Sequence, residues 1–297
     1  MVVGAVALWA VNATVSKVVL QSGMSTLRLA ETRAAGAAVL FVAAAALKRS
    51  RSLRTSRSEL PWLAAFGVLG LALVQFFYYV GIKRLDIGVS LVIEYITPVL
   101  VALWARFVVK EPVRRRLWLA IAVALAGLSL VVDLWGGFSL DGLGVAACLL
   151  AALAYTGYIL IAERSLHTGR DVLSLLAWGF AFATLFWSIV QPWWSYPVSL
   201  VNDTVPLLGR LDSIDLPVWT LLLFIVVLGT FVPFILMVGS LHHIRATRAT
   251  IAAMLEPVLA SVVAFAWLGE SLTASEIAGG VLVLIGVGIA QSARAHV

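Results

Sequence analysis

The second half of this chain repeats the first at an offset of 159 residues. Residues 96–100 (Ile-Thr-Pro-Val-Leu) recur as residues 255–259 (Leu-Glu-Pro-Val-Leu). The same offset then relates Ala105 to Ala264, Glu111 to Glu270, Leu125 to Leu284 and Gly127 to Gly286. In so apolar a sequence the paired Pro, Glu and Gly residues are the informative matches. They indicate an internal duplication, with one repeat in residues 1–135 and a second in residues 136–297, joined at a turn-rich segment near residues 135–141.

The composition places both repeats in a membrane. Hydrophobic residues make up 62% of the chain, charged residues 12%, and the mean hydropathy is +1.04, which is more apolar surface than a soluble fold of this length can bury. A helix needs about 20 apolar residues to cross the hydrocarbon core. Ten such stretches are predicted, at residues 3–21, 28–47, 61–82, 88–109, 117–134, 142–163, 172–192, 217–238, 248–268 and 275–292. The expected fold is an all-α membrane protein with two five-helix repeats, which then lie in the bilayer in opposite orientations.

The net charge of +6 is explained by the positions of the basic residues. With the N-terminus inside, fourteen of them fall in cytoplasmic loops or the C-terminal tail, and three fall in the opposite loops. The cytoplasmic set is Lys48, Arg49, Arg51, Arg54, Arg57, Lys110, Arg114, Arg115, Arg116, Arg164, Arg170, Arg245, Arg248 and Arg294, and the opposite set is Lys83, Arg84 and Arg210. The positive-inside rule therefore predicts that both termini are cytoplasmic. The partner that this charge indicates is the lipid bilayer, and we expect no nucleic-acid partner.

Two carboxylates inside predicted helices are the first candidates for a binding site, because a charge at the centre of a membrane costs about 2.5 to 3.5 kcal/mol or more. Glu94 shares a helix face with Thr97, and Thr97 aligns with Glu256 across the repeat. The duplication thus brings one carboxylate from each half toward the midplane. Pro98 and Pro257 each prevent a backbone hydrogen bond, so we expect both to act as hinges. The alternative is that the carboxylates only close a polar network between the helices.

Other ionisable residues have two interpretations each. Lys17 and Glu31 lie at similar depth on consecutive antiparallel helices, so they are predicted to form an ion pair, which would serve as a structural link or as a gate. Glu111 and Glu270 stand where the fifth and tenth helices are predicted to begin. A carboxylate at a positive helix terminus is the simpler explanation for them.

Polar and aromatic residues at helical spacing complete the candidate cavity. Trp9 and Asn12 share a face of the first helix, Gln75 and Tyr78 lie in the third, and Tyr155 lies in the sixth. Aromatic residues in such a pattern more often pack against neighbouring helices than bind a ligand.

The five-plus-five plan, the Glu256-Pro257 element with residues 268–273 after it, and residues 32–34 resemble the drug/metabolite transporter superfamily, specifically its EamA family. Within that family, residues 91–98, 158–164 and 254–257 look most like the threonine/homoserine exporter branch. The resemblance carries a membrane-embedded role onto Arg33, Glu94, Pro98, Glu256 and Pro257. It implies efflux of small metabolites such as amino acids across the bacterial cytoplasmic membrane. Tyr155 departs from the family, whose members often have Trp there, and this bears on the shape of the cavity.

The motif content favours a secondary transporter over an enzyme. The sequence has no H-E-x-x-H, no G-x-S-x-G and no P-loop, and its four histidines lie in predicted loops or the tail. We therefore expect no catalytic residue, metal site or cofactor. A substrate amino group is expected near Glu94 or Glu256 and its carboxylate near Arg33, with protons as a further partner. Export of drugs, a channel and a non-transport membrane partner are the alternatives, and the sequence does not predict an oligomeric state.

Overall fold

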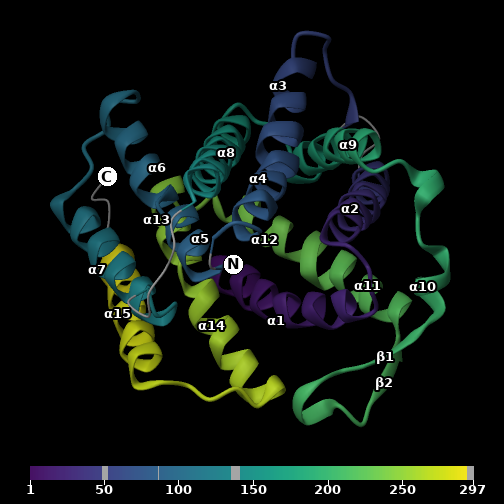
Figure 1. Ribbon diagram of the computed structural model, residues 1–297. Helices are drawn as coiled ribbons and strands as arrows, with labels where there is room; N and C mark the ends of the chain where they lie inside the picture. Colours follow the sequence, from purple (N-terminus) through teal and green to yellow (C-terminus); the bar gives the residue numbers. More distant parts are fainter. Residues whose placement is uncertain (49–52, 86, 135–140, 293–297) are drawn as a thin grey trace.

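The computed structural model describes residues 1–48, 53–85, 87–134 and 141–292. Helices account for most of them (Figure 1). The first half contains α1 (Val2–Gln21), α2 (Thr26–Lys48), α3 (Leu60–Ala65), η2 (Phe66–Ala72), α4 (Leu73–Ile82), α5 (Ile87–Glu94), α6 (Thr97–Phe107) and α7 (Arg115–Val131). The second half contains α8 (Gly142–His167), α9 (Val172–Val190), η3 (Trp193–Ser195), α10 (Val198–Asn202), β1 (Thr204–Pro206), η4 (Gly209–Leu211), β2 (Asp215–Pro217), α11 (Val218–Val226), η5 (Val227–Phe231), α12 (Val232–Ser240), α13 (Ala246–Ala253), α14 (Leu255–Val263), η6 (Ala264–Leu268) and α15 (Ala274–Ser292).

Nine helical stretches in the described part of the chain are long and apolar enough to cross a membrane. They coincide with nine of the ten predicted spans to within a few residues. The remaining prediction, residues 117–134, corresponds to α7, whose 17 residues reach about 26 Å at the usual rise per residue. This helix is shorter than the hydrocarbon core of about 30 Å, so the expected count of ten is not confirmed.

The all-α prediction needs one correction, in the long segment between α9 and α11. There β1 and β2 pair antiparallel, with Val205 opposite Leu216. The hairpin forms because Pro206 and Pro217 fix extended backbone at the ends of the two strands, and because the Val218 N–H donates to the Asp203 carbonyl. This segment has no counterpart of similar length in the first half.

The backbone repeats with the periodicity of the sequence. The helix of the fourth span breaks at Tyr95 and Ile96, just before Thr97-Pro98. The helix of the ninth span breaks at Met254, the counterpart of Tyr95 and two residues before Glu256-Pro257. The π-helical turns η2 and η5 end 159 residues apart. Lys110 (φ 61°), after α6, and Gly269 (φ 74°), after η6, are also 159 residues apart, and both adopt left-handed backbone. The duplication therefore extends to irregular backbone that apolarity alone does not specify.

The first two helices of each repeat follow a shorter offset, because the hairpin segment is inserted after them in the second half. The first residues of α2 and α9 are 146 residues apart. The packing agrees with this offset: Gly36 of α2 lies against Val226, and Phe182 of α9 lies against Gly67. Gly36 corresponds to Phe182 by the shorter offset and Val226 to Gly67 by the longer one, so the two contacts are the same contact made from each half.

The two halves pack closely where α7 and α15 lie side by side (Figure 1). A Cβ added at Gly127 would lie 2.6 Å from the Gly279 carbonyl oxygen, and one added at Gly286 would lie 2.8 Å from the Ala120 carbonyl oxygen. Small residues allow such close backbone approach between membrane helices. Elsewhere α1 packs on α14, α2 on α9 and α4 on α8, and these contacts surround the candidate site.

Candidate functional site

Glu94 and Glu256 lie at the two helix breaks in the middle of the molecule. Glu94 is the last residue of α5, and Glu256 is the second residue of α14. Both side chains are half-buried, and the two carboxylates are close enough to interact electrostatically. The duplication thus brings together one carboxylate from each half, as the sequence predicts.

A group of tyrosines surrounds the two carboxylates. The Tyr95 hydroxyl donates to Glu256 Oε2 at 3.1 Å. Tyr78 and Tyr155 each interact electrostatically with both Glu94 and Glu256. These residues come from the fourth span, from α4 and from α8, so the walls of the site draw on both repeats.

Arg33 provides the cation of the site. It interacts electrostatically with Glu256 and with Tyr79. Its Nε donates to Thr230 Oγ1 at 3.2 Å, and the Thr230 hydroxyl donates in turn to the Ile225 carbonyl at 2.8 Å. Thr230 lies in the π-turn η5, a backbone feature that often occurs at functional sites. The π-turn therefore fixes the arginine within electrostatic reach of Glu256.

Two residues of the site escaped the sequence analysis. Tyr95 follows Glu94 directly. Its place just before Thr97-Pro98 was the sequence feature that could have indicated that its hydroxyl reaches Glu256. Thr230 is one of several threonines in apolar helices, and nothing in the sequence around it reveals a π-turn. Only the packing of α2 on η5 identifies it.

The other predicted residues are placed at the edge of this group or outside it. Trp9 makes an edge-to-face contact with Phe234 at 5.5 Å between ring centroids, and Tyr155 stacks on Tyr158 at 5.8 Å. Asn12 is buried against Gly229 in η5, and its Oδ1 has no hydrogen-bond partner in the described part of the protein. Gln75 is half-buried in α4, one turn before Tyr78 and Tyr79.

Thr97 is not available to a ligand, although it is the repeat counterpart of Glu256. It is fully buried, and its hydroxyl donates to the Glu94 carbonyl at 2.8 Å and to the Ala152 carbonyl at 3.3 Å. These bonds link the break in the fourth span to α8. Thr97 therefore shapes the site through the backbone rather than through its own polar atom.

The predicted ion pair between Lys17 and Glu31 is wrong. Lys17 Nζ lies 3.0 Å from Glu270 Oε1. This is because α1 packs on α14, and Glu270 lies just after η6, which continues α14 along the chain. Glu31 is fully buried and pairs with Arg28, three residues earlier on the same face of α2. Arg28 also donates to the Gln191 and Pro192 carbonyls, at 3.2 and 3.0 Å, and to Ser195. The pair anchors the segment after α9.

Glu111 and Glu270 do not begin helices, contrary to the simpler explanation from the sequence. α7 begins at Arg115 and α15 at Ala274. Both glutamates instead close the end of the preceding helix: the Glu111 N–H donates to the Ala105 carbonyl at 2.9 Å, and the Glu270 N–H donates to the Ala264 carbonyl at 3.4 Å. Their carboxylates form ion pairs with Arg245 and Lys17.

The side chains of the central site are suited to pairing with charged groups. No group of three His, Cys, Asp or Glu side chains in the described ranges could hold a metal ion. Two carboxylates, one guanidinium and several phenolic hydroxyls lie between apolar helix faces, where water is scarce and a charge needs a partner. A bound ammonium group would be matched by the carboxylates, and a bound carboxylate by Arg33.

Comparison with known proteins identifies the family and the fold of this chain. The sequence matches the EamA-like transporter family over residues 1–133 and 142–290. It is 24% identical to the uncharacterized transporter YdfC of Bacillus subtilis, over 77% of this chain and 70% of that protein. It is 25% identical to an uncharacterized transporter of Archaeoglobus fulgidus over 75% of each chain. A protein of known crystal structure shares the fold, with a TM-score of 0.75 over 97% of this chain and 94% of that one at 18% identity.

Proposed function

Because this chain belongs to the EamA-like transporter family, we propose that it is a secondary transporter that exports small zwitterionic metabolites, with amino acids as the first class to test. The observation that carries the proposal is the electrostatic interaction between Glu94 and Glu256, one from each repeat, with Arg33 near enough to interact electrostatically with Glu256. Carboxylates and a guanidinium held this way match the ammonium and carboxylate groups of an amino acid. The likeness to the threonine/homoserine exporter branch makes these two compounds the first candidates.

The transport mechanism that we propose is alternating access. Ten helices, with α7 as the shortest, would form two inverted repeats with both termini in the cytoplasm of a bacterial cell. Substrate would bind between the repeats, and a rocking motion about the breaks before Pro98 and Pro257 would expose it on the other side. The two broken helices allow such a motion because each lacks the continuous hydrogen bonding of a regular helix.

Protons are the proposed coupling ion. Glu94 and Glu256 repel each other when both are charged, and binding of one proton relieves that repulsion. A substrate ammonium group would relieve it equally, so substrate and proton would compete for the same pair of carboxylates. If a Glu256→Gln variant kept the wild-type response of transport to an imposed pH gradient, Glu256 could not be the coupling site.

Counterflow in proteoliposomes tests the proposal directly. Wild-type protein, Glu94→Gln, Glu256→Gln and Arg33→Gln would be assayed with a panel of labelled amino acids, and Asp212→Asn, in the exposed loop, would serve as the matched control. We expect saturable counterflow of at least one amino acid that the control retains and the three site variants lose. Normal counterflow in Glu94→Gln and Glu256→Gln would refute the proposed site.

Export of organic cations is the second candidate. It is favoured by the excess of carboxylates over guanidinium at the site and by the tyrosine walls, since aromatic faces attract cations. The Arg33→Gln variant separates the two candidates. It should abolish transport of an amino acid but leave transport of a cation without a carboxylate unchanged or faster.

A further inference from the structure

Two cavities lie on either side of the central site, and equivalent positions of the two repeats line them. The first has a volume of about 720 Å³ and is lined by Ala105 and Glu111, among others. The second has a volume of about 280 Å³ and is lined by Ala264 and Glu270. The segments that carry these residues, α6 and α14 with η6, leave the centre of the molecule in opposite directions (Figure 1). The two cavities are therefore at opposite ends of the repeat pair.

Both cavities extend to the neighbourhood of the carboxylates. Thr156 lines the first cavity, and its hydroxyl donates to the Ala152 carbonyl at 2.8 Å, the same carbonyl that Thr97 contacts. Leu91 and Pro257 line the second cavity. Leu91 is three residues before Glu94, and Pro257 follows Glu256. The inner ends of both cavities are thus within one helical turn of the residues that form the site.

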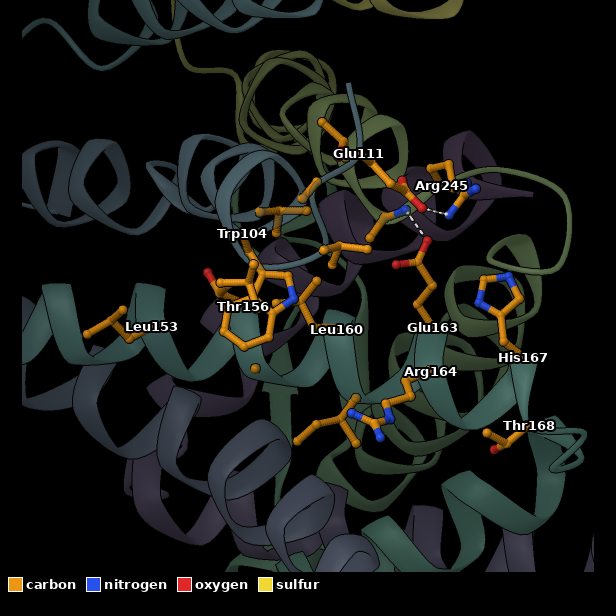
Figure 2. A pocket seen from close by; sticks show the side chains of 18 of the residues that line it. Trp104, Glu111, Leu153, Thr156, Leu160, Glu163, Arg164, His167, Thr168 and Arg245 are labelled. Carbon is orange, nitrogen blue, oxygen red and sulfur yellow. Dashed lines mark hydrogen bonds and ion pairs between the residues drawn. The ribbon is translucent and has the colours of Figure 1, made fainter. Parts of the chain in front are cut away.

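Two glutamates in the lining of the first cavity bind the N-terminus of α13, and Figure 2 shows Glu111 and Glu163 close to Arg245. Glu111 follows α6, and its Oε1 accepts from Arg245 at 2.8 Å. Glu163 lies on α8, and its Oε1 accepts from the Ala246 backbone N–H, also at 2.8 Å. Arg245 is the N-cap of α13, so the two carboxylates neutralise both an arginine and the positive end of a helix. Elements of both repeats are joined at this point.

The equivalent positions at the second cavity make a different contact. By the two offsets of the repeat, Glu270 corresponds to Glu111 and Lys17 corresponds to Glu163. Lys17 and Glu270 pair with each other at 3.0 Å, and their side chains are 53% and 54% exposed, much like those of Arg245 and Glu111 at 63% and 40%. They join α1 to the end of η6, two elements that already pack together through α14.

We propose that the two cavities are the two access paths to the substrate site, and that Glu111 and Glu163 form a latch on α13 that closes the first path. This inference rests on the proposed transport function. With the latch formed, substrate reaches Glu94 and Glu256 through the second cavity. Release of Arg245 and Ala246 lets α13 move away from α6 and α8, and the first cavity then opens. Because the basic loops predicted to be cytoplasmic surround the latch, the first path is assigned to the cytoplasmic side.

Cysteine labelling tests the latch without any substrate. In a Cys148→Ala background, which removes the sole native cysteine, the equivalent alanines are replaced one at a time, as Ala105→Cys in the first cavity and Ala264→Cys in the second. A membrane-impermeant thiol reagent is added to one side of inverted or right-side-out vesicles. Each probe is combined with Glu111→Gln, with Glu163→Ala, or with Lys48→Gln, which removes an exposed ion pair that lines neither cavity.

We expect Ala105→Cys to react only from the cytoplasmic side and Ala264→Cys only from the outside. Glu111→Gln and Glu163→Ala should speed the first reaction roughly 2- to 5-fold and slow the second, since loss of a partly exposed contact shifts a two-state equilibrium by about this much. Lys48→Gln should change neither. Arg245→Gln, which removes the other partner, should reproduce the effect of Glu111→Gln.

The outcomes separate the latch from the proposed substrate. Reaction of both probes from the same side would overturn the two-path assignment, and unchanged rates in all three latch variants would overturn the latch. If instead the labelling pattern holds and no amino acid is transported by the wild type, the latch stands and the proposed substrate class is wrong. Monodisperse elution of each variant in detergent shows that the change in labelling does not arise from misfolding.

Discussion

The two halves of the molecule share a backbone and differ in chemistry. The helix break before Pro98 has its counterpart before Pro257, but Thr97 is fully buried and bonded to carbonyls, whereas Glu256 is half-buried and accepts from Tyr95. The same contrast appears where the second helix of each repeat meets a π-turn. Arg33 of α2 bonds to Thr230 of η5. At the equivalent contact, Gly179 of α9 faces Leu71 of η2.

This difference separates the backbone of a duplicated membrane protein, which is shared by the halves, from the side-chain chemistry, which is not. The irregular backbone recurs in both halves, which fits a need for the same motion on both sides. At the central site the polar side chains do not recur at equivalent positions, since Thr97 matches Glu256 and Gly179 matches Arg33. The experiments below test whether backbone and chemistry are separable in this way.

The largest effect is expected from moving the carboxylate between the halves. Glu256→Gln should lower counterflow at least about 10-fold, as loss of a hydrogen-bonded charge in a poorly hydrated site does. The exchange variant Thr97→Glu with Glu256→Thr should be no better, because a carboxylate at position 97 would face the Ala152 carbonyl. Initial rates of counterflow, normalised to reconstituted protein, measure both. Recovery of transport in the exchange variant would mean that the two positions are interchangeable.

The buried ion pair of α2 is the next test, since its counterparts in α9 are Ser174 and Ala177. Glu31→Gln leaves the Arg28 charge buried without its carboxylate, and we expect a loss of about 3 to 5 kcal/mol of stability. The double variant Arg28→Ser with Glu31→Ala, which copies the second half, should lose less than the sum of its single changes. Thermal unfolding in detergent measures the series.

Lys48→Gln is the control for this series, because its ion pair with Asp171 is exposed and such pairs contribute less than about 1 kcal/mol. Strict additivity of the Arg28 and Glu31 changes would show that the two side chains do not act as a pair.

A smaller effect is expected at the contact of α7 with α15. Gly279→Ala would bring a Cβ within 2.5 Å of the Gly127 carbonyl oxygen, and we expect a loss of about 1 to 3 kcal/mol from overpacking. Gly288→Ala in the same helix meets nothing within 4 Å and should be neutral. Equal melting temperatures for the two variants would show that the halves are not in close contact there.

The smallest effect concerns Glu59, which joins the two halves through Arg170. Hydrogen bonds from Thr55 and from the Ser56 N–H, with the Arg170 guanidinium nearby, lower the pKa of the Glu59 carboxyl from its ordinary value of 4.5. A lowered folded-state pKa stabilises the protein above pH 4.5, and the contribution is lost as the pH falls through the lowered value. The melting temperatures of wild type and Glu59→Gln should therefore differ slightly at neutral pH and converge in acid. A difference that grows in acid would contradict this.

The sequence was sufficient for nine of the ten predicted spans and for the approach of Glu94 to Glu256, because both depend on hydropathy and on matched prolines. The role of the two carboxylates in binding stays a prediction. It was not sufficient for the π-turns, since one extra residue in a helix that is apolar all round leaves the pattern unchanged. The partner of Lys17 was misassigned because depth in the membrane does not fix the rotation of a helix. Arg28, three residues from Glu31 on the same helix, was the nearer partner for the Glu31 carboxylate. The predicted junction at residues 135–140 lies outside the described residues, and the division into two domains there stays a prediction.

The contact between α7 and α15 bears on how the duplicated chain evolved. Gly127 against Gly279 and Gly286 against Ala120 are one contact made twice, which is the form of an isologous interface between identical subunits. Two copies of a single five-helix chain, inserted into the membrane in opposite directions, would associate through this contact. Fusion of the two genes would then have freed each copy to change alone, and the unequal chemistry of Arg33 and Gly179 is the kind of divergence that a symmetric dimer could not have acquired.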